Sequence, residues 1–566
     1  MSAPKARQAI DSALKQRGFK RDWTKAAHLR YRGRLDPTGL NIPVSIEIPD
    51  LDFVNIPIIR VDAGGISTKN PVPHLAGPDG EFCYLEPRST VLDKYNPGGT
   101  VLRCLVRAEQ VLGDAVRGKL NADFAAEYVN YWSSSPLLID LPVDFQGEAA
   151  IYWIALNRDH KEKVSAVLTR KNKLARSLKD AHVRARGEGS KPSSEPCWVA
   201  KVDRELGLDP DASRPPRTLT QLKKFLFAIR ATEALVDNAL RQGEGLNRWV
   251  AIRAPNAFCL AQIQIPPRFD TQEFMRSRKR NLPQALESVA SEIRIERYRG
   301  FPVDADFLYG RNLADRPTLA GKRLALIGCG TIGSFLALLL AQSGAGSKSG
   351  RLVLFDNENL MPSNLGRHLL GLNELNRNKA EACAEHIRTQ LPFLDVEARP
   401  ADVLKSVAGL RDFDLVIDAT GEEALSIALN DYAVSKRPDF PPTLHAWIIG
   451  NGGAAQVLLC DGPERACFKC LKPELAGQPR LRVMRDESAA TLRRMGACGD
   501  GLYAPFPVSV SAAAAALALD LVLAWNSGRP GHRLRTRTFD SAQCFSPKDT
   551  TLEASAVCPA CGDKQA

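Results

Sequence analysis

The feature that most constrains the fold is a glycine-rich turn between two apolar segments. Residues 323–327 read Arg-Leu-Ala-Leu-Ile, and residues 328–333 read Gly-Cys-Gly-Thr-Ile-Gly before a long apolar segment. Gly328 permits a tight turn, Gly330 lets the backbone approach a phosphate, and Gly333 lets a helix pack closely on a strand. The pattern therefore predicts a strand, a phosphate-binding turn and a helix whose free N–H groups face the phosphates.

A second strand with a terminal carboxylate follows this turn. Residues 351–355 are apolar enough for a buried strand, and Asp356 ends it. Asp356 lies roughly 26 residues after Gly330, where a carboxylate is placed to bind a ribose hydroxyl. Alternating strands and helices predict an α/β fold with a mostly parallel, doubly wound, Rossmann-like sheet. The glycine turn and Asp356 alone fit ATP and NAD equally well.

Polar residues farther along distinguish these two nucleotides. Asn364 and Arg367 are three residues apart, so a helix would place them on one face. Lys379 follows about one helix later, and Asp418 ends a buried strand at 415–418. Arg and Lys suit a polyphosphate from which pyrophosphate leaves, and a carboxylate beside it suits Mg²⁺. Together they favour adenylation with ATP·Mg²⁺, because a nicotinamide oxidoreductase needs neither the two cations nor the metal.

Two C-x-x-C pairs predict a metal site in the same region. Cys467 and Cys470 form the first pair, and Cys558 and Cys561 form the second. Zn²⁺ prefers four tetrahedral thiolates, and each pair supplies two of them from a tight turn. The predicted Zn²⁺ is structural and fastens the end of the chain to the rest of its domain.

Composition limits the cellular setting. The 566 residues include 13 cysteines and carry a net charge of +12. The first residues lack the apolar core of a secretory signal, so we expect a cytoplasmic protein whose cysteines bind metal or do thiol chemistry. The apolar run at 512–525 is short and contains Asp520, which favours a buried helix over a membrane span. A basic stretch at 158–186 is typical of a solvated surface, and nucleic acid is not an expected partner.

The order of patterns predicts three domains, at 1–155, 156–300 and 301–566. In the first, residues 3–16 and 100–112 have helical spacing, and residues 40–48 alternate as a strand does. Pro43 within that strand would suit an edge of the sheet. In the second, residues 218–241 have helical spacing but no motif suggests chemistry, so we expect a middle linker domain.

The last domain resembles the ThiF/MoeB/ubiquitin-activating superfamily over residues 301–566. The resemblance implies that Asp356 binds ribose, that Asn364, Arg367 and Lys379 bind phosphates, and that Asp418 binds Mg²⁺. It also implies an arginine that reaches ATP across a homodimer, for which Arg311 is the nearest candidate.

Cys498 lies between the two C-x-x-C pairs, in Gly-Ala-Cys-Gly-Asp-Gly at 496–501. Flanking glycines let a thiol approach another chain closely. The resemblance to the superfamily implies that this cysteine attacks an acyl adenylate and forms a thioester or persulfide.

The first domain resembles the ubiquitin-conjugating α+β fold. The resemblance is carried by the N-terminal helix, the strands, Pro73-His74, and Gly80-x-x-Cys83 before a helix. It implies a thioester on Cys83, with His74 shaping the loop or polarising the acyl oxygen. The asparagine that follows His-Pro in eukaryotic members has no match here, which leaves the oxyanion contact unassigned.

A conjugating-type domain joined to an activating-type domain resembles the bacterial fusions known as CD-NTase-associated ligases of CBASS anti-phage operons. The resemblance implies adenylation of a partner's C-terminal carboxylate, transfer through Cys498 and Cys83, and conjugation to a target lysine. The partner would be a CD-NTase-type cyclic-oligonucleotide synthase or a ubiquitin-like protein.

Other functions remain open on the sequence. Activation of a ubiquitin-like or sulfur-carrier protein, as in ThiF and MoeB, uses the last domain and needs no conjugating step. A zinc-stabilised scaffold that binds ATP without turnover is a non-enzymatic alternative, although the set of Arg367, Lys379 and Asp418 argues against it. A nicotinamide oxidoreductase is the remaining alternative.

Overall fold

The computed structural model describes residues 2–23, 29–37, 39–62, 66, 72–76, 80–86, 89–133, 135–154, 165–170, 176, 193–207, 215–232, 234–243, 245–271, 274, 281–313, 315–486, 492–494 and 502–562. Cys498 and most of the basic stretch at 158–186 lie outside these residues. The chain divides into two compact units. The first contains residues 1–170 and 190–301, and the second contains 171–189 and 302–566.

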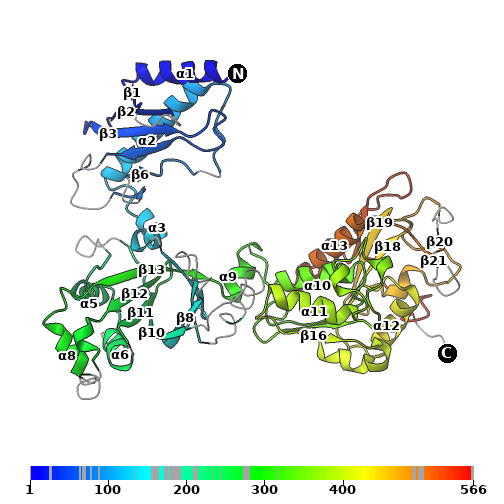
Figure 1. Cartoon of the computed structure of the whole chain (residues 1–566). Helices are drawn as coiled ribbons and strands as arrows, with labels where there is room; N and C mark the ends of the chain where they lie inside the picture. The colour runs from blue at the N-terminus through cyan, green and yellow to red at the C-terminus, as the bar shows by residue number, and fades with distance from the viewer. Residues whose placement is uncertain are drawn as a thin grey trace. The chain divides into compact units, whose positions relative to one another are not determined.

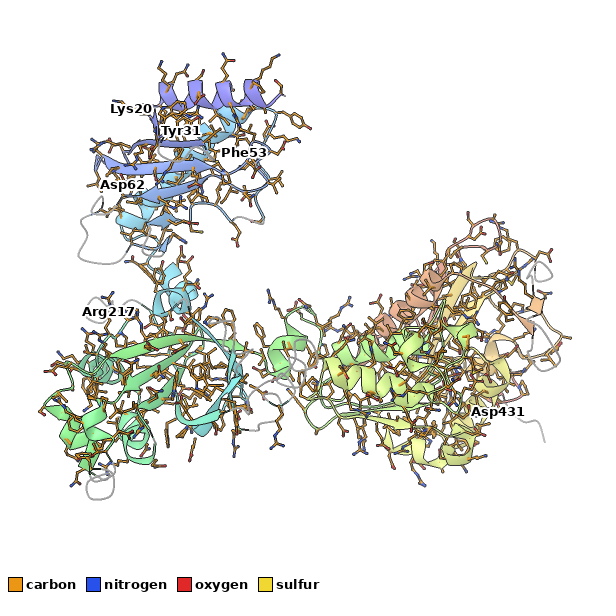
Figure 2. All side chains as sticks on the ribbon, viewed as in Figure 1. Lys20, Tyr31, Phe53, Asp62, Arg217 and Asp431 are labelled. Carbon is orange, nitrogen blue, oxygen red and sulfur yellow. The ribbon has the colours of Figure 1, made fainter. Side chains whose placement is uncertain are left out.

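The first unit begins with a six-stranded sheet in the order β1-β2-β3-β4-β6-β5. Its strands are β1 (Lys20–Arg21), β2 (Leu29–Leu35), β3 (Ile42–Ile48), β4 (Ile58–Val61), β5 (Leu75–Ala76) and β6 (Glu81–Phe82). The predicted helices at 3–16 and 100–112 are confirmed as α1 (Ala3–Gln16) and α2 (Pro97–Val116). Both contribute apolar side chains to the core of this sheet, in which the buried Tyr31 and Phe53 are labelled in Figure 2.

The expected edge position of Pro43 is wrong. β3 lies between β2 and β4, and Pro43 is its second residue, opposite Arg34 of β2. The ladder with β4 begins only at Val44. A proline without an N–H is tolerated here because it lies near the start of the strand.

The rest of the first unit is a closed seven-stranded barrel, which the sequence did not suggest. The strand order is β10-β11-β12-β13-β7-β9-β8. The strands are β7 (Pro136–Asp140), β8 (Gly147–Ile154), β9 (Ser165–Thr169), β10 (Ser193–Lys201), β11 (Asn247–Arg253), β12 (Phe258–Gln264) and β13 (Ile295–Pro302). The expected domain boundary at residue 155 falls between β8 and β9, so we propose that the barrel domain begins before β7.

Helices cover the barrel and form a second core with it. They are α3 (Asp123–Trp132), α5 (Leu219–Ala228), α6 (Ala234–Gln242) and α8 (Leu282–Glu287). The helical pattern at 218–241 therefore corresponds to two helices, α5 and α6. Side chains on one side of the strands, such as Val250 and Ile252, pack against these helices, whereas Trp249 and Ala251 belong to a separate core cluster.

The second unit contains a seven-stranded sheet in the order β16-β15-β14-β17-β18-β19-β22. Its strands are β14 (Arg323–Ile327), β15 (Arg351–Phe355), β16 (Val396–Arg399), β17 (Leu415–Asp418), β18 (Thr443–Ile449), β19 (Ala454–Cys460) and β22 (Leu534–Thr538). The first five strands are parallel, and β19 and β22 are antiparallel to their neighbours. The predicted strands at 323–327, 351–355 and 415–418 are confirmed, as is the mostly parallel sheet.

Helices pack on both faces of this sheet (Figure 1). One core joins the sheet to α10 (Gly333–Gln342), α11 (Lys379–Gln390) and α13 (Val508–Asn526). The other joins it to α12 (Glu423–Ser435) and the 3₁₀ segment η5 (Val403–Asp412). Alternate residues of β14 enter opposite cores, which is the arrangement of a doubly wound fold.

Among the described helices, α13 alone is long and apolar enough to cross a membrane. Its side chains instead pack within this unit, where Ala514, Leu521 and Val522 are fully buried in the core with α10. The expectation of a buried helix at 512–525 is confirmed.

Candidate functional site

The glycine turn 328–333 has the geometry that its sequence predicts. Gly328 has a φ of +85°, and a Cβ there would lie 2.8 Å from the Thr420 side chain. A Cβ on Gly333 would lie only 1.8 Å from the carbonyl oxygen of Gly328, so close packing requires glycine. A Cβ on Gly330 would meet nothing within 4 Å. Gly330 thus borders open space, as expected where a phosphate approaches the backbone.

This open space is a cleft of about 400 Å³ at the carboxyl ends of the strands. Gly328, Gly330, Asp356 and Lys379 line it, together with Glu358, Glu422 and apolar side chains that include Val403, Leu404 and Leu425. The apolar side chains suit a purine ring, and the glycine turn suits phosphates. The cleft therefore fits a nucleotide.

Asp356 forms one wall of the cleft and fixes the turn. Its Oδ2 accepts a hydrogen bond of 2.7 Å from the Cys329 N–H, and its Oδ1 accepts one of 2.8 Å from the Glu358 N–H. Burial raises the pKa of the Asp356 carboxyl, while the two N–H donors and Lys379 act in the opposite direction. Asp356 is at the predicted place for a ribose contact, and that role remains a prediction.

Lys379 supplies a cation to the same cleft. It is the first residue of α11, only 5% of it is exposed, and its Nζ pairs with the carboxylate of Glu358. Asn378 caps the helix and donates hydrogen bonds to the carbonyl oxygens of Asp356 and Glu358. Glu358 is 63% exposed, so an arriving polyphosphate can replace it as the partner of Lys379.

Asn364 and Arg367 do not line the cleft described above. Asn364 ends a 3₁₀ turn and accepts a hydrogen bond from the Met361 N–H, so no α-helix joins it to Arg367. The Arg367 guanidinium lies 4.8 Å from the ring of Phe506. Its carbonyl oxygen accepts a hydrogen bond of 2.9 Å from the Thr331 hydroxyl. Arg367 thus lies between the glycine turn and residues 503–506, close in sequence to Cys498.

His368 also contacts the glycine turn, and no sequence pattern singled it out. Its Nε2 donates to the Cys329 carbonyl oxygen at 2.7 Å, and its Nδ1 accepts from the Leu370 N–H at 3.1 Å. Burial lowers the pKa of this imidazole, so the neutral tautomer persists. Only its position next to Arg367 could have drawn attention to it.

Asp418 faces the interior of the domain. It is 2% exposed, and its two oxygens bind the Thr420 hydroxyl at 2.7 Å, the Ser426 hydroxyl, and His445 Nδ1 at 2.9 Å. Burial would raise the pKa of Asp418, but His445 and the hydroxyl donors outweigh burial and lower it. The Asp418 oxygens therefore have protein partners in this structure, and its role as a Mg²⁺ ligand remains a prediction. The carboxylates that line the cleft are Glu358, Glu422, Asp402 and Asp356.

Arg311 follows α9 (Ala305–Gly310) and is exposed, with its guanidinium 5.9 Å from the Phe307 ring. It does not line the nucleotide cleft of its own chain. The predicted reach across a homodimer remains a prediction.

The four predicted zinc ligands come together. The Sγ atoms of Cys467, Cys470, Cys558 and Cys561 all lie within 4.8 Å of one another. Neighbouring sulfurs are 3.3–3.8 Å apart, and tetrahedral Zn–S bonds of about 2.3 Å imply about 3.8 Å. The four thiols are buried or nearly so, and the Ser555 N–H lies 3.3 Å from the Cys470 sulfur. This donor set fits a closed, structural Zn²⁺ site.

Cys83 is exposed and follows β6 directly. Its N–H donates to the His74 carbonyl oxygen at 2.8 Å. Burial of the sulfur raises the pKa of the Cys83 thiol, and the carboxylates of Glu127, Glu86 and Glu81 raise it further. The thiol is therefore accessible to another chain but is largely protonated at neutral pH.

His74 lies beside this thiol, against α3. Its Nε2 is 3.0 Å from Asp123 Oδ2, and its Nδ1 is 3.1 Å from Glu127 Oε1. Both ring nitrogens thus face carboxylates, which leaves no ring N–H for an acyl oxygen. The geometry favours the loop-shaping role of His74, and the sequence had not indicated the part played by α3.

Comparisons with known proteins match two different parts of the chain to two families. The model of the ThiF family matches residues 310–558, and the model named Prokaryotic E2 family B matches residues 2–137. The "Sulfur carrier protein ThiS adenylyltransferase" of Escherichia coli K12 is 29% identical over 184 residues, covering 30% of this chain and 69% of that protein. The crystal structure of E. coli MccB covers 44% of this chain and 67% of that one at 19% identity, with a TM-score of 0.34, too low to support a structural argument.

One relative matches along the whole chain. The "ATP-dependent ubiquitin transferase-like protein Cap2" of Pseudomonas aeruginosa (strain BWHPSA011 / Pa011) is 31% identical over 589 aligned residues, covering 99% of this chain and 100% of that protein. The chain is accordingly an enzyme that combines an adenylating ThiF domain with an E2-like domain. It belongs to the family of Cap2-type, ATP-dependent ubiquitin transferase-like proteins.

Proposed function

We propose that this enzyme adenylates the C-terminal carboxylate of a partner protein and conjugates that C-terminus to a target lysine through Cys498 and Cys83. The partner we propose is a CD-NTase-type cyclic-oligonucleotide synthase, which conjugation would prime for anti-phage defence. The observation that carries the proposal is the presence in one chain of the glycine-turn cleft with Lys379 and the exposed Cys83 beside His74. The match to Cap2 over the full length supports the same combination.

In the first step the partner carboxylate attacks the α-phosphate of ATP, and pyrophosphate leaves. The glycine turn would hold the phosphates with backbone N–H groups, and Lys379 would offset the charge that develops on the leaving pyrophosphate. Mg²⁺ bound to the triphosphate would supply further positive charge. The cleft carboxylates Glu422 and Asp402 would hold it.

In the later steps the acyl group moves between nucleophiles. The Cys498 thiolate attacks the acyl carbon and AMP leaves. The Cys83 thiolate then displaces Cys498, and a lysine amine finally displaces Cys83 and loses a proton. Each step exchanges one activated acyl bond for another until the stable amide forms. The raised pKa of the Cys83 thiol makes its thiolate a basic nucleophile, although a small fraction of the thiol at neutral pH.

The experiment that tests this relay is mass spectrometry of the full chain with ATP·Mg²⁺ and the partner protein under non-reducing conditions. We expect a reducible adduct on Cys83 in the wild type and none in Cys498→Ala. Cys83→Ala should retain the adduct on Cys498 and lose conjugation. An adduct confined to Cys498, with conjugation unchanged in Cys83→Ala, would refute the relay.

A second candidate is activation of a ubiquitin-like or sulfur-carrier protein without conjugation. The likeness of the ThiF region to a ThiS adenylyltransferase favours it. It assigns no role to Cys83, so the same Cys83→Ala variant distinguishes the two functions.

For either function we propose a cytoplasmic homodimer in which Arg311 reaches the nucleotide of the other subunit.

A further inference from the structure

Helix α3 is anchored in the barrel of the first unit. Tyr128 and Trp132 are buried in the core cluster that α3 shares with the barrel strands and helices. The Trp132 Nε1–H donates to the Leu260 carbonyl oxygen of β12 at 3.0 Å. The Asn256 side-chain amide donates to the Ala125 carbonyl oxygen. The barrel therefore fixes both the position and the rotation of α3.

Three polar residues of α3 meet His74. Asp123, Glu127 and Tyr131 are four residues apart in turn, so they lie on one helical face. Asp123 and Glu127 contact the two ring nitrogens, and the His74 N–H donates to the Tyr131 hydroxyl at 3.0 Å. The Tyr131 hydroxyl in turn donates to Glu127 Oε2 at 3.2 Å.

His74 links α3 to the backbone of Cys83. Its φ of +64° is uncommon for a residue with a side chain, so its conformation depends on surrounding contacts. Its carbonyl oxygen accepts the Cys83 N–H at 2.8 Å, next to the β5–β6 pair Leu75 and Phe82. A chain of contacts thus runs from the barrel through α3 and His74 to the backbone of Cys83.

We propose that α3 forms a positioning wall for the Cys83 site. In this arrangement Asp123, Glu127 and Tyr131 are positioning residues that hold His74, and through it the Cys83 strand, in the geometry for acyl transfer. The barrel then serves the conjugating step because it anchors α3. The inference depends on the proposed thioester at Cys83, but the contacts themselves can be tested without a partner protein.

The first test is hydrogen–deuterium exchange of the full chain, read on peptides that contain the His74 and Cys83 amides. We expect Glu127→Gln and Asp123→Asn each to speed exchange there about tenfold, as loss of one charge-assisted hydrogen bond would. Trp132→Phe, which removes the Nε1–H donor but keeps an aromatic ring, should speed it in the same peptides. The matched control Glu86→Gln removes a carboxylate near Cys83 that does not contact His74, and it should leave exchange unchanged.

The second test is the pH profile of Cys83 alkylation by iodoacetamide, measured by peptide mass spectrometry. The charged groups that face the thiol are Glu127 from α3, Glu81 of β6 and Glu86, which follows β6. Alkylation follows the thiolate fraction. Removing one neighbouring carboxylate in Glu86→Gln or Glu127→Gln should raise the rate at fixed pH about twofold to threefold.

Equal exchange in Glu127→Gln and Glu86→Gln would overturn the positioning wall, and so would a Glu127→Gln alkylation rate equal to that of the wild type. Unchanged exchange in a folded Trp132→Phe would remove the barrel from the proposal. If both tests succeed while no acyl adduct forms on Cys83, the wall stands and the proposed relay fails. If an acyl adduct forms on Cys83 while both tests are negative, the proposed relay stands and the positioning wall fails.

Discussion

Lys379 illustrates how a single residue acquires a role from its surroundings. It is almost fully buried at the start of α11, yet its ammonium reaches the cleft and has an exposed carboxylate, Glu358, as its partner. A buried cation needs a partner of opposite charge. An exposed glutamate can supply one before ATP binds and can withdraw to water when the phosphates arrive.

Lys379→Met should weaken binding of ATP·Mg²⁺ about 30-fold, which corresponds to about 2 kcal/mol for a lost charge-assisted hydrogen bond. The methionine keeps the buried volume, so the fold should persist. The measurement is a calorimetric titration with ATP·Mg²⁺. Arg377→Met is the matched control, because Arg377 pairs with Glu374 and Glu385 and does not line the cleft. Equal loss of affinity in both variants would contradict a specific phosphate contact.

At the scale of elements, the turn between β14 and α10 separates two roles of glycine. Gly333 is required by packing, because its missing side chain leaves room for the Gly328 carbonyl oxygen. Gly330 faces open space in the cleft, where the missing side chain leaves room for a ligand. The two positions look alike in the sequence and differ only in what lies opposite them.

Gly333→Ala should destabilise the second unit by about 2 kcal/mol or more, since overpacking forces the backbone to shift. Gly330→Ala should change stability by less than about 0.5 kcal/mol, because the new methyl group meets no protein atom. Gly330→Ala should nevertheless weaken ATP·Mg²⁺ binding by narrowing the approach to the backbone. Differential scanning calorimetry gives the first two values and a nucleotide titration gives the third. A Gly330→Ala enzyme that binds ATP normally would show that the phosphates lie elsewhere.

At the scale of the whole molecule, the cysteine cluster fastens the end of the chain. The second C-x-x-C pair lies near the C-terminus and meets the first pair, which borders η6 (Phe468–Leu471), about ninety residues earlier in the sequence. Since metal binding stabilises the folded state, Zn²⁺ would contribute directly to the stability of this unit.

We expect one Zn²⁺ per chain by elemental analysis, and a lower unfolding temperature after chelation. Affinity for zinc should fall as the pH falls, because thiols must lose protons to bind the metal. Cys467→Ser should reproduce the effect of chelation. Cys544→Ser, at a buried cysteine outside the cluster, should keep the metal. Full stability in metal-free protein would refute a structural role for zinc.

Short-range patterns in the amino-acid sequence predict the local elements and their order. The strands at 323–327, 351–355 and 415–418, the glycine turn, the first helix and each of the two C-x-x-C pairs all follow from short-range patterns. These features depend on periodicity, on backbone conformations that only glycine adopts readily, and on fixed ligand spacing. Each of these is encoded within a few neighbouring residues.

Tertiary structure alone decided which side chains face a site. Asp418 ends its strand as predicted, but its carboxylate forms hydrogen bonds with His445 and Ser426 in the interior of the domain. These two residues come from other elements. The barrel was not predicted because several of its strand pairs, such as β8 with β10 and β7 with β13, join segments that are far apart in the chain. Pairing between distant segments leaves no local periodicity. The contact of α3 with His74 arises in the same way: Asp123 and Glu127 lie about fifty residues from His74 in the chain and meet it only because the barrel holds their helix there. Side-chain partners across such distances depend on the packing of whole domains, which a local sequence pattern does not record.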